Sequence, residues 1–548
     1  MGFLKDLTKN KTVLVFLVAF ILFGFYLRSF NIDLPSIGYH NMKENEYLSQ
    51  ANLQSELGDY LRRPMHIFGA EVNPFFEEYP QMPLLPWVFQ LIWLFTGEQI
   101  WAARLIIILL SLLTIPALYI LTKKITKSNY MGLTSALIFS FLPLSVFFGR
   151  NIQPETPALF FLVLGMALFT YYLESWDKKD LIKTTAALAV AGLIKPTFLI
   201  GVIPMLALFP FQKLANKEWF TKRVKDALWG IVPLLIVPLW MFISNLLNTK
   251  QTLTEGTFSR INLFRIFGEG YWNQFWPTLS NYILDNYTWT IVYFALFGIA
   301  IAAFRYKSKL ARFLGAYCLA IIPYCMILAD FIKGHSYYQF PFLPLVCIAT
   351  AYFLYTLGML LKQLTKIPFI QFAALLLLLL PMGDIQAATN RQYDTIFYGL
   401  DIAADYLEKN SEKDEKFWIM GHSQTVGVCY NSHRMCDGPF YEDFNKTVRI
   451  GNEKKFNWVF IHGQQGLAVL QQPGREKFWR YFQDNFHPAL IALGPQTLPN
   501  GQPVPSGFLL KRGGNFSLDA ISPQGFKQRQ HVYDLTGGQV QVIVLEEQ

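Results

Sequence analysis

The chain has 548 residues, of which 53% are hydrophobic and only 16% are charged. Soluble domains usually carry about 25% charged residues, so this composition excludes an ordinary soluble protein. A formal net charge of +9 would suit nucleic-acid binding, but the basic residues fall in clusters between long apolar runs. Clusters in every second connection form the positive-inside pattern of a polytopic membrane protein, which accounts for nearly all of the basic excess.

The first apolar run, at about 12–30, follows three lysines. It is similar to a signal peptide, but it is long and no small-residue cleavage site follows, so we predict an uncleaved helix with a cytoplasmic N-terminus. The next stretch, about 31–100, then forms a first outer loop. Within this loop we predict a polar helix at residues 47–61 and an amphipathic helix at residues 84–95, both at the membrane interface.

Later apolar runs predict membrane helices at 101–121, 130–148, 157–173, 227–246, 288–304, 313–332, 340–361 and 367–382. The run at 183–211 has basic clusters at both ends and is interrupted by Lys195-Pro196. Since proline ends or kinks helices, we expect two short helices that meet on the outer side at Lys195. The total is about eleven helices, and an odd number places the C-terminus outside the cytoplasm.

The composition becomes that of a soluble domain from about residue 386. We therefore predict an all-α polytopic membrane domain over 1–385, which includes the first outer loop, and an extracytoplasmic α/β domain over 386–548. Interleaved patterns support the second domain. They predict helices at 396–407 and 476–486, and strands at 417–420, 458–462, 507–510 and 539–545.

Five cysteines do not form a disulfide scaffold. Cys429 and Cys436 lie in the soluble part, and they can pair if that part is outside the cytoplasm. The His and Cys residues lack the spacing of metal ligands, so we predict no metal and no cofactor. The chain has no Walker loop, which disfavours an ATP-driven pump.

Under the predicted topology, polar residues gather on the outer side of the membrane. Ionisable groups beside membrane spans are costly and usually functional. The candidates are His40, Glu44, Glu46, Glu78, Arg150, Glu155, Lys195, His335, Tyr337 and Tyr338. Their convergence on one side indicates group transfer from a phosphate leaving group. A carboxylate can take the proton of an acceptor hydroxyl, while cationic, His and Tyr side chains bind the phosphate oxygens.

Each candidate also has a structural interpretation. Glu44 and Glu46 can be solvated interfacial residues, and Arg150 can reach to lipid headgroups. Glu155 can complement a helix dipole, and His335 can be a capping or interfacial aromatic residue. Lys195 fits a structural interpretation least, because it lies at a helix-breaking proline.

Short motifs follow one another along the chain: Tyr39-His40, Glu44 to Tyr47, Glu78-Tyr79-Pro80-Gln81-Met82-Pro83, Ala103-Arg104-Leu105, Arg150 with Pro154-Glu155, Gly192 to Pro196, and His335 to Pro344. This ordered set, over about residues 10–360, resembles the C-type glycosyltransferases that use lipid-phosphate-linked sugars. The resemblance is to the branch with protein O-mannosyltransferases and bacterial aminoarabinose transferases.

The resemblance implies a polyprenyl- or dolichyl-phosphate sugar as donor and a hydroxyl acceptor on a lipid, protein or polysaccharide, at the plasma membrane. It implies that Glu46, with Glu44 second, is the base, and that Glu155 orients the acceptor or sugar. The phosphate would be bound by Lys195, Arg150, His335, Tyr337 and Tyr338, with His40 and Glu78 near the acceptor or sugar. The expected outcome is inversion at the anomeric carbon without an obligatory metal.

One departure from the family pattern concerns the base. The first-loop acid of the family is usually Asp, whereas only Glu is present here, and the family's Trp-Arg-Gln reads Met42-Lys43-Glu44. This leaves open whether Glu44 or Glu46 is the base, and it keeps open an inactive scaffold with the same fold. The other alternative to a transferase is a transporter or flippase for a lipid-linked sugar, which would need ionisable residues through the depth of the bilayer, whereas here they gather at one face.

Overall fold

The computed structural model describes residues 6–8, 10–67, 75, 81–247, 263–421, 423–438, 444–470, 472–497, 503–516 and 525–548. The chain forms two compact units. Unit 1 comprises Met1–Ile32, Pro80–Met82 and Ala103–Thr389, and unit 2 comprises Asp33–Tyr79, Pro83–Ala102 and Asn390–Gln548. The first outer loop, which the sequence analysis grouped with the membrane helices, therefore packs with the C-terminal part.

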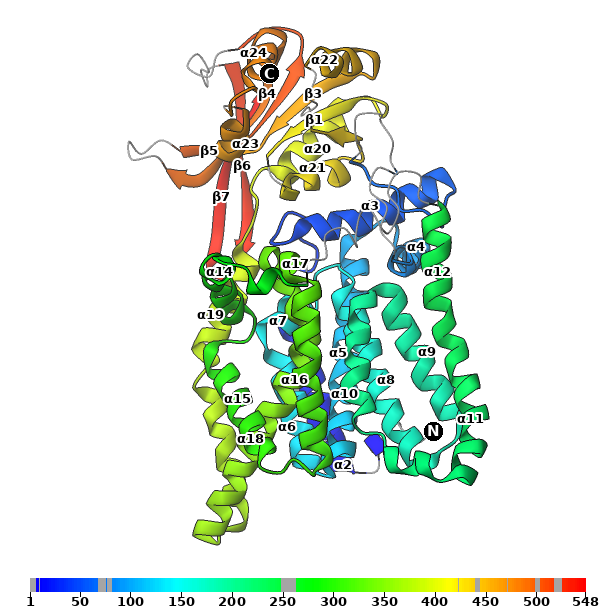
Figure 1. Cartoon of the computed structure of the whole chain (residues 1–548). Coiled ribbons are helices and arrows are strands. Elements are labelled where there is room, and N and C mark those ends of the chain that lie inside the picture. Colours follow the sequence, from blue (N-terminus) through cyan, green and yellow to red (C-terminus); the bar gives the residue numbers. More distant parts are fainter. Residues whose placement is uncertain are drawn as a thin grey trace. The chain divides into compact units, whose positions relative to one another are not determined.

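Unit 1 is helical (Figure 1). Its elements are α2 (Lys11–Arg28), α5 (Ile100–Thr126), α6 (Asn129–Phe141), α7 (Pro143–Phe147), α8 (Glu155–Ser175), α9 (Lys178–Ile194), η1 (Pro196–Gly201), α10 (Val202–Leu206), η2 (Phe211–Ala215), α11 (Lys217–Ile231), η3 (Val232–Leu235), α12 (Ile236–Leu247), η5 (Arg265–Phe267), α14 (Tyr271–Asn286), α15 (Trp289–Ala303), α16 (Lys309–Ile327), α17 (Ala329–Gly334), η6 (Ser336–Phe342), α18 (Leu343–Thr365), η7 (Pro368–Leu379) and α19 (Met382–Asp394).

Within the described residues, six helices are long and apolar enough to cross a membrane, or up to eight if each bent pair is one span. This supports a multi-pass membrane protein, whereas the predicted number of about eleven is not confirmed. Two predicted elements differ in detail. The helix predicted at 130–148 is divided into α6 and α7, because Pro143 starts a new helix. The connection between the helices predicted at 227–246 and 288–304 contains α14, which bends by 91° into α15.

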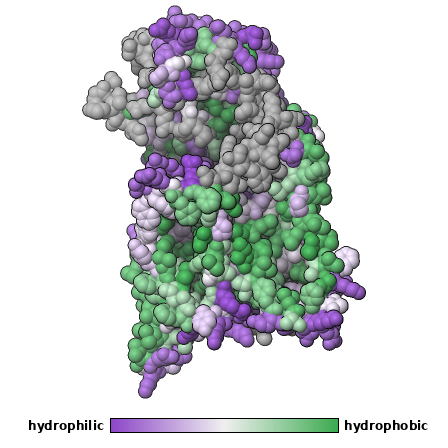
Figure 2. Space-filling view, viewed as in Figure 1, coloured by the Kyte–Doolittle hydropathy of each residue, from purple (hydrophilic) through white to green (hydrophobic). Residues whose placement is uncertain are grey.

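The basic connections of unit 1 gather at one end of the helices. Lys124, at the end of α5, lies 3.0 Å from Asp6 and 2.7 Å from Glu174. Arg223 of α11 donates to the carbonyl of Trp176, which follows α8. This is the lower end in Figure 1, and Figure 2 shows hydrophilic residues there beneath a broad hydrophobic surface. The arrangement has the charge distribution expected of helices that cross a bilayer.

The loop before α8 is fixed by the buried Arg28, the last residue of α2. Its Nε donates to Ser111 Oγ at 2.9 Å, and its Nη1 donates to the Ser140 carbonyl at 3.0 Å. Gly149 packs directly against it, since a Cβ there would lie 2.7 Å from Arg28 Nε and 2.6 Å from Ser111 Oγ. Only glycine fits this approach, so the loop that leads to Glu155 is held in place.

Unit 2 is an α/β structure. Its elements are α3 (Asn41–Leu57), α4 (Leu84–Thr96), α20 (Leu400–Asn410), β1 (Lys416–Met420), η8 (Ser423–Val426), α21 (Gly427–Asn431), β2 (Cys436–Asp437), α22 (Phe444–Glu453), β3 (Phe456–Ile461), α23 (Gly463–Leu470), α24 (Glu476–Asn485), β4 (Phe486–Thr497), β5 (Pro503–Arg512), β6 (Phe526–Leu535) and β7 (Gly538–Glu547). A seven-stranded sheet has the order β2-β1-β3-β5-β4-β7-β6. The first three strands are parallel, and the others pair antiparallel.

Alternate residues of the strands form two hydrophobic cores, one on each face of the sheet. One core packs against α20 and α21 and also contains Ile37 from the first outer loop. Backbone hydrogen bonds extend this contact, from Phe397 N to the Ile37 carbonyl at 2.9 Å and from Cys436 N to the His66 carbonyl at 2.8 Å. The first outer loop is thus part of the fold of unit 2.

Candidate functional site

The predicted break at Lys195-Pro196 is present, and it places Lys195 against Glu155. Helix α9 ends at Ile194, Lys195 is extended, and η1 starts at Pro196. The Lys195 ammonium forms an ion pair with Glu155 Oε1, although Lys195 is only 7% and Glu155 only 2% exposed. Glu155 starts α8, whose 21 residues rise by about 30 Å toward the basic end. The pair therefore lies at the other end of α8 from the basic connections.

Aromatic side chains of η6 complete this cluster, which we call the Lys195 cluster (Glu155, Lys195, His335, Tyr337, Tyr338). Lys195 Nζ lies 5.2 Å from the ring centroid of Tyr337 and 4.6 Å from that of Tyr338. The His335 ring is stacked on Tyr337 with centroids 5.1 Å apart. Cation–π contacts and an ion pair let a buried ammonium persist in an apolar surrounding.

Arg150 has different partners. It donates through Nη1 to the Phe30 carbonyl and, at 3.2 Å, to the Asn31 carbonyl. Both acceptors follow α2, and Asn31 has a positive φ of 47°. These contacts join the end of α2 to the loop before α8, so they support a structural role for Arg150.

The first-loop acids lie in unit 2, on α3. Glu46 is buried, and each of its oxygens has a cationic partner: Oε2 lies 2.6 Å from Lys43 Nζ, and Oε1 lies 3.0 Å from Arg63 Nη2. Burial alone would raise the pKa of Glu46, but the positive charges of Lys43 and Arg63 outweigh it and lower that pKa. Glu46 is consequently an ionised carboxylate with reduced proton affinity. Arg63 was not among the residues predicted from the sequence, because it belongs to no recognisable motif.

Glu44 is buried two positions away on the same helix turn, and its Oε2 accepts a hydrogen bond from Ser36 Oγ at 2.9 Å. His40 precedes α3 with a left-handed φ of 57°, and its ring lies 4.1 Å from that of Tyr39. Glu78 lies outside the described residues. No group of three His, Cys, Asp or Glu side chains in the described part of the chain could hold a metal ion.

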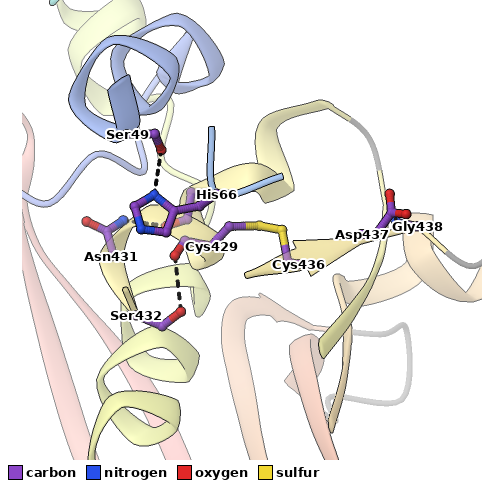
Figure 3. Close-up of a disulfide and its surroundings, with 9 residues drawn as sticks. Ser49, His66, Cys429, Asn431, Ser432, Cys436, Asp437 and Gly438 are labelled. Carbon is purple, nitrogen blue, oxygen red and sulfur yellow. Dashed lines mark hydrogen bonds between the residues drawn. A yellow bond between two sulfur atoms is a disulfide. The ribbon is translucent and has the colours of Figure 1, made fainter. Parts of the chain in front are cut away.

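Cys429 and Cys436, whose pairing the sequence left open, form a disulfide in unit 2 with their Cα atoms 5.7 Å apart. Figure 3 shows this bond beside His66, whose Nδ1 lies 3.0 Å from Ser49 Oγ of α3. The disulfide joins α21 to β2, and β2 contacts the first outer loop through the bridge between Cys436 and Ile67. Burial lowers the pKa of His66 to about 3, so this ring is neutral beside the disulfide.

A close contact between α21 and α3 also fixes the acidic segment. Gln424 in η8, which directly precedes α21, accepts through Oε1 from Met42 N at 3.3 Å. A Cβ at Gly427 would lie 2.9 Å from the Ser36 carbonyl and 3.2 Å from Asn45 Nδ2. The C-terminal part thus holds the start of α3, where Glu44 and Glu46 lie.

We expect Gly427→Ala to displace the start of α3, because a methyl group has no space there. Overpacking of this kind costs about 1–3 kcal/mol, measurable as a lower melting temperature of the full chain. Gly537→Ala is the matched control, since a Cβ at Gly537 meets no atom of the described residues within 4 Å. Equal melting temperatures of the two variants would contradict the close packing of α21 on α3.

Residues 79–242, less than half of the chain, match the family described as dolichyl-phosphate-mannose-protein mannosyltransferase. Among solved structures, archaeal oligosaccharyltransferase AglB from Archaeoglobus fulgidus, in complex with an inhibitory peptide and a dolichol-phosphate, is similar at 13% identity. The match covers 93% of this chain and 74% of that one, with a TM-score of 0.59. ArnT from Cupriavidus metallidurans, bound to undecaprenyl phosphate, matches at 12% identity over 97% of this chain and 98% of that one, with a TM-score of 0.52.

The chain has a C-type glycosyltransferase fold. The resemblance inferred from the motifs is confirmed, and the comparisons indicate a membrane glycosyltransferase. No curated protein sequence matches the chain. The matched segment includes Arg150, Glu155 and Lys195 but not α3 or η6.

Proposed function

We propose that this protein transfers a sugar from a polyprenyl- or dolichyl-phosphate donor to a hydroxyl acceptor on the extracytoplasmic side of the membrane. The observation that carries the proposal is the Lys195 cluster. A buried ammonium next to Tyr337, Tyr338 and His335 suits an anionic phosphate, because a cation in a low-dielectric environment stabilises the charge of a departing phosphate. AglB and ArnT, which share the fold, were solved with dolichol-phosphate and undecaprenyl phosphate.

In the proposed reaction, a carboxylate of α3 takes the proton of the acceptor hydroxyl. The acceptor oxygen forms a bond to the anomeric carbon, the bond from that carbon to the phosphate oxygen breaks, and the lipid phosphate leaves. Direct displacement of this kind inverts the anomeric configuration. Glu44 and Glu46 are the candidates, and the two cationic partners of Glu46, which lower its proton affinity, weigh against Glu46 as the base.

The predicted side of the membrane has two kinds of support. The basic connections gather at the end of α8 that lies away from Glu155, and the positive-inside rule assigns that end to the cytoplasm. Unit 2 contains the disulfide between Cys429 and Cys436, and such bonds persist mainly outside the cytoplasm. We propose the plasma membrane as the location, with unit 2 extracytoplasmic.

The test uses the full chain in lipid nanodiscs with labelled polyprenyl-phosphate sugars and with lipid, peptide and polysaccharide acceptors. We expect release of polyprenyl phosphate together with labelling of one acceptor class, with inverted anomeric configuration. Absence of turnover with every donor would remove the proposal. If vesicles then showed facilitated movement of the lipid-linked sugar, the transporter alternative would replace it, whereas an inert chain would support the scaffold.

A further inference from the structure

Gln153, which lies in the loop between α7 and α8, has a buried side chain that the described structure leaves without hydrogen bonds. It is 0% exposed, and neither Oε1 nor Nε2 has a partner among the described residues. The large majority of buried side-chain polar atoms in proteins have a hydrogen-bond partner. Two unsatisfied atoms on one fully buried amide therefore point to a ligand.

The position of Gln153 is set by a well-fixed loop. Thr156 Oγ1 donates to the Phe148 carbonyl at 2.7 Å, and Arg150 N donates to the Phe147 carbonyl at 3.1 Å. Gly149 packs against Arg28 at the start of this loop. Because the backbone of this loop is fixed, the Gln153 amide cannot readily move to another hydrogen-bond partner.

Two further side-chain oxygens, on Glu155 and Thr197, are also buried without a hydrogen-bond partner among the described residues. Glu155 uses Oε1 for Lys195, while its Oε2 is buried and has no partner in the described part of the chain. Thr197 Oγ1, two residues beyond Lys195, is likewise buried without a described partner. The ion pair between Glu155 and Lys195 brings the two segments together, and η1 contacts α8.

The chemistry of these atoms selects hydroxyl groups. Gln153 presents a carbonyl acceptor and an NH2 group with two donor hydrogens, Glu155 Oε2 accepts, and the Thr197 hydroxyl does both. A phosphate only accepts and would be repelled by Glu155, whereas a sugar hydroxyl both donates and accepts. We infer that Gln153, Glu155 Oε2 and Thr197 form the binding site for the hydroxyls of the donor's sugar ring, next to Lys195. In a lipid-phosphate sugar, the sugar ring is attached directly to the phosphate. The site for the ring hydroxyls and the site for the phosphate must therefore be adjacent.

This inference rests on the proposed function. Replacing Gln153 tests it most directly. Gln153→Met keeps the size of the side chain and removes an amide that has no partner in the described chain. We expect an unchanged or higher melting temperature without ligand, together with a 10- to 100-fold lower kcat/KM, about what one or two lost hydrogen bonds produce. The loss should appear in the KM for the donor. Binding of undecaprenyl phosphate without a sugar, measured by calorimetry, should be unchanged.

Gln339→Met is the matched control. Gln339 is as deeply buried in unit 1, but its Oε1 accepts from Asn286 Nδ2 at 3.0 Å. We expect this variant to melt at a lower temperature than the wild type. A lower melting temperature of Gln153→Met, or a loss confined to the KM of the acceptor, would overturn the inference. If the wild type turned over no donor, the proposed function would fail, and the comparison of the two melting temperatures would still decide whether Gln153 faces a ligand.

Discussion

Replacing Lys195 by methionine is expected to lower both the stability and the activity of the protein more than any exposed charge replacement. The Lys195–Glu155 pair is almost fully buried. Removing one partner leaves an uncompensated buried charge, which costs about 3–5 kcal/mol. Thermal unfolding of the full chain in detergent measures the first effect. Transfer from a lipid-phosphate sugar measures the second, and we expect it to fall about 100-fold or more, as when one electrostatic donor is removed from an active site.

The double variant Lys195→Met/Glu155→Gln separates the two effects. It has no buried charge left from the pair, so its melting temperature should return toward that of the wild type. Its activity should stay low, because the phosphate has lost the ammonium. Lys409→Met is the control for a solvent-exposed pair, as Lys409 and Asp405 are 67% and 51% exposed, and it should change stability by less than about 1 kcal/mol. A fully active double variant would exclude a role of Lys195 in the reaction.

The second large change in activity and stability is expected when Glu44 or Glu46 of α3 is replaced by glutamine. Glu44→Gln keeps an acceptor for the hydrogen bond from Ser36 Oγ, so its melting temperature should fall less than that of Glu46→Gln. As the loss of a general base, Glu44→Gln should reduce the rate by about 10²–10⁴-fold. Glu46→Gln should instead unfold at a clearly lower temperature, since it leaves the buried Arg63 without its ionised partner.

The comparison of the two variants is decisive. If Glu44→Gln turned over at the wild-type rate while Glu46→Gln melted normally and was inactive, Glu46 would be the base. The pH dependence gives a second measurement. The pKa of Glu46 is lowered from 4.5, so its stabilising ion pairs are fully present above about pH 4.5 and are lost as the pH falls through the lowered pKa. The wild type should therefore lose stability below pH 4.5, and Glu46→Gln should lose less.

Local signals in the sequence predicted much of this arrangement. Apolar runs predicted a multi-pass helical unit, and basic clusters in alternate connections predicted the common end of the basic turns, because charge is costly inside a bilayer. Proline next to Lys195 predicted the break after α9. The four predicted strands correspond to β1, β3, β5 and β7, but β2, β4 and β6 were missed. β2 has only two residues, and the outward face of β6 is largely polar.

The role of the first outer loop could not be predicted in the same way. Its acids were found from a motif, but their partners lie at distant positions. Arg63 is 17 residues from Glu46, and Gln424 is 382 residues from Met42. Neither spacing follows a helical or strand period, so no pattern in the sequence reports these contacts.

The sequence by itself determined the class of this protein: a multi-pass membrane chain with acidic, basic and aromatic motifs in the order of the C-type glycosyltransferases. It could do so because hydropathy and charge are local properties that the bilayer sorts directly. Only the tertiary structure decided that the first outer loop packs with the C-terminal part, that Lys195 pairs with Glu155, and that the amide of the buried Gln153 has no hydrogen-bond partner among the described residues. Burial and pairing depend on which distant segments meet, and hydrogen-bond satisfaction can be judged only after they have met.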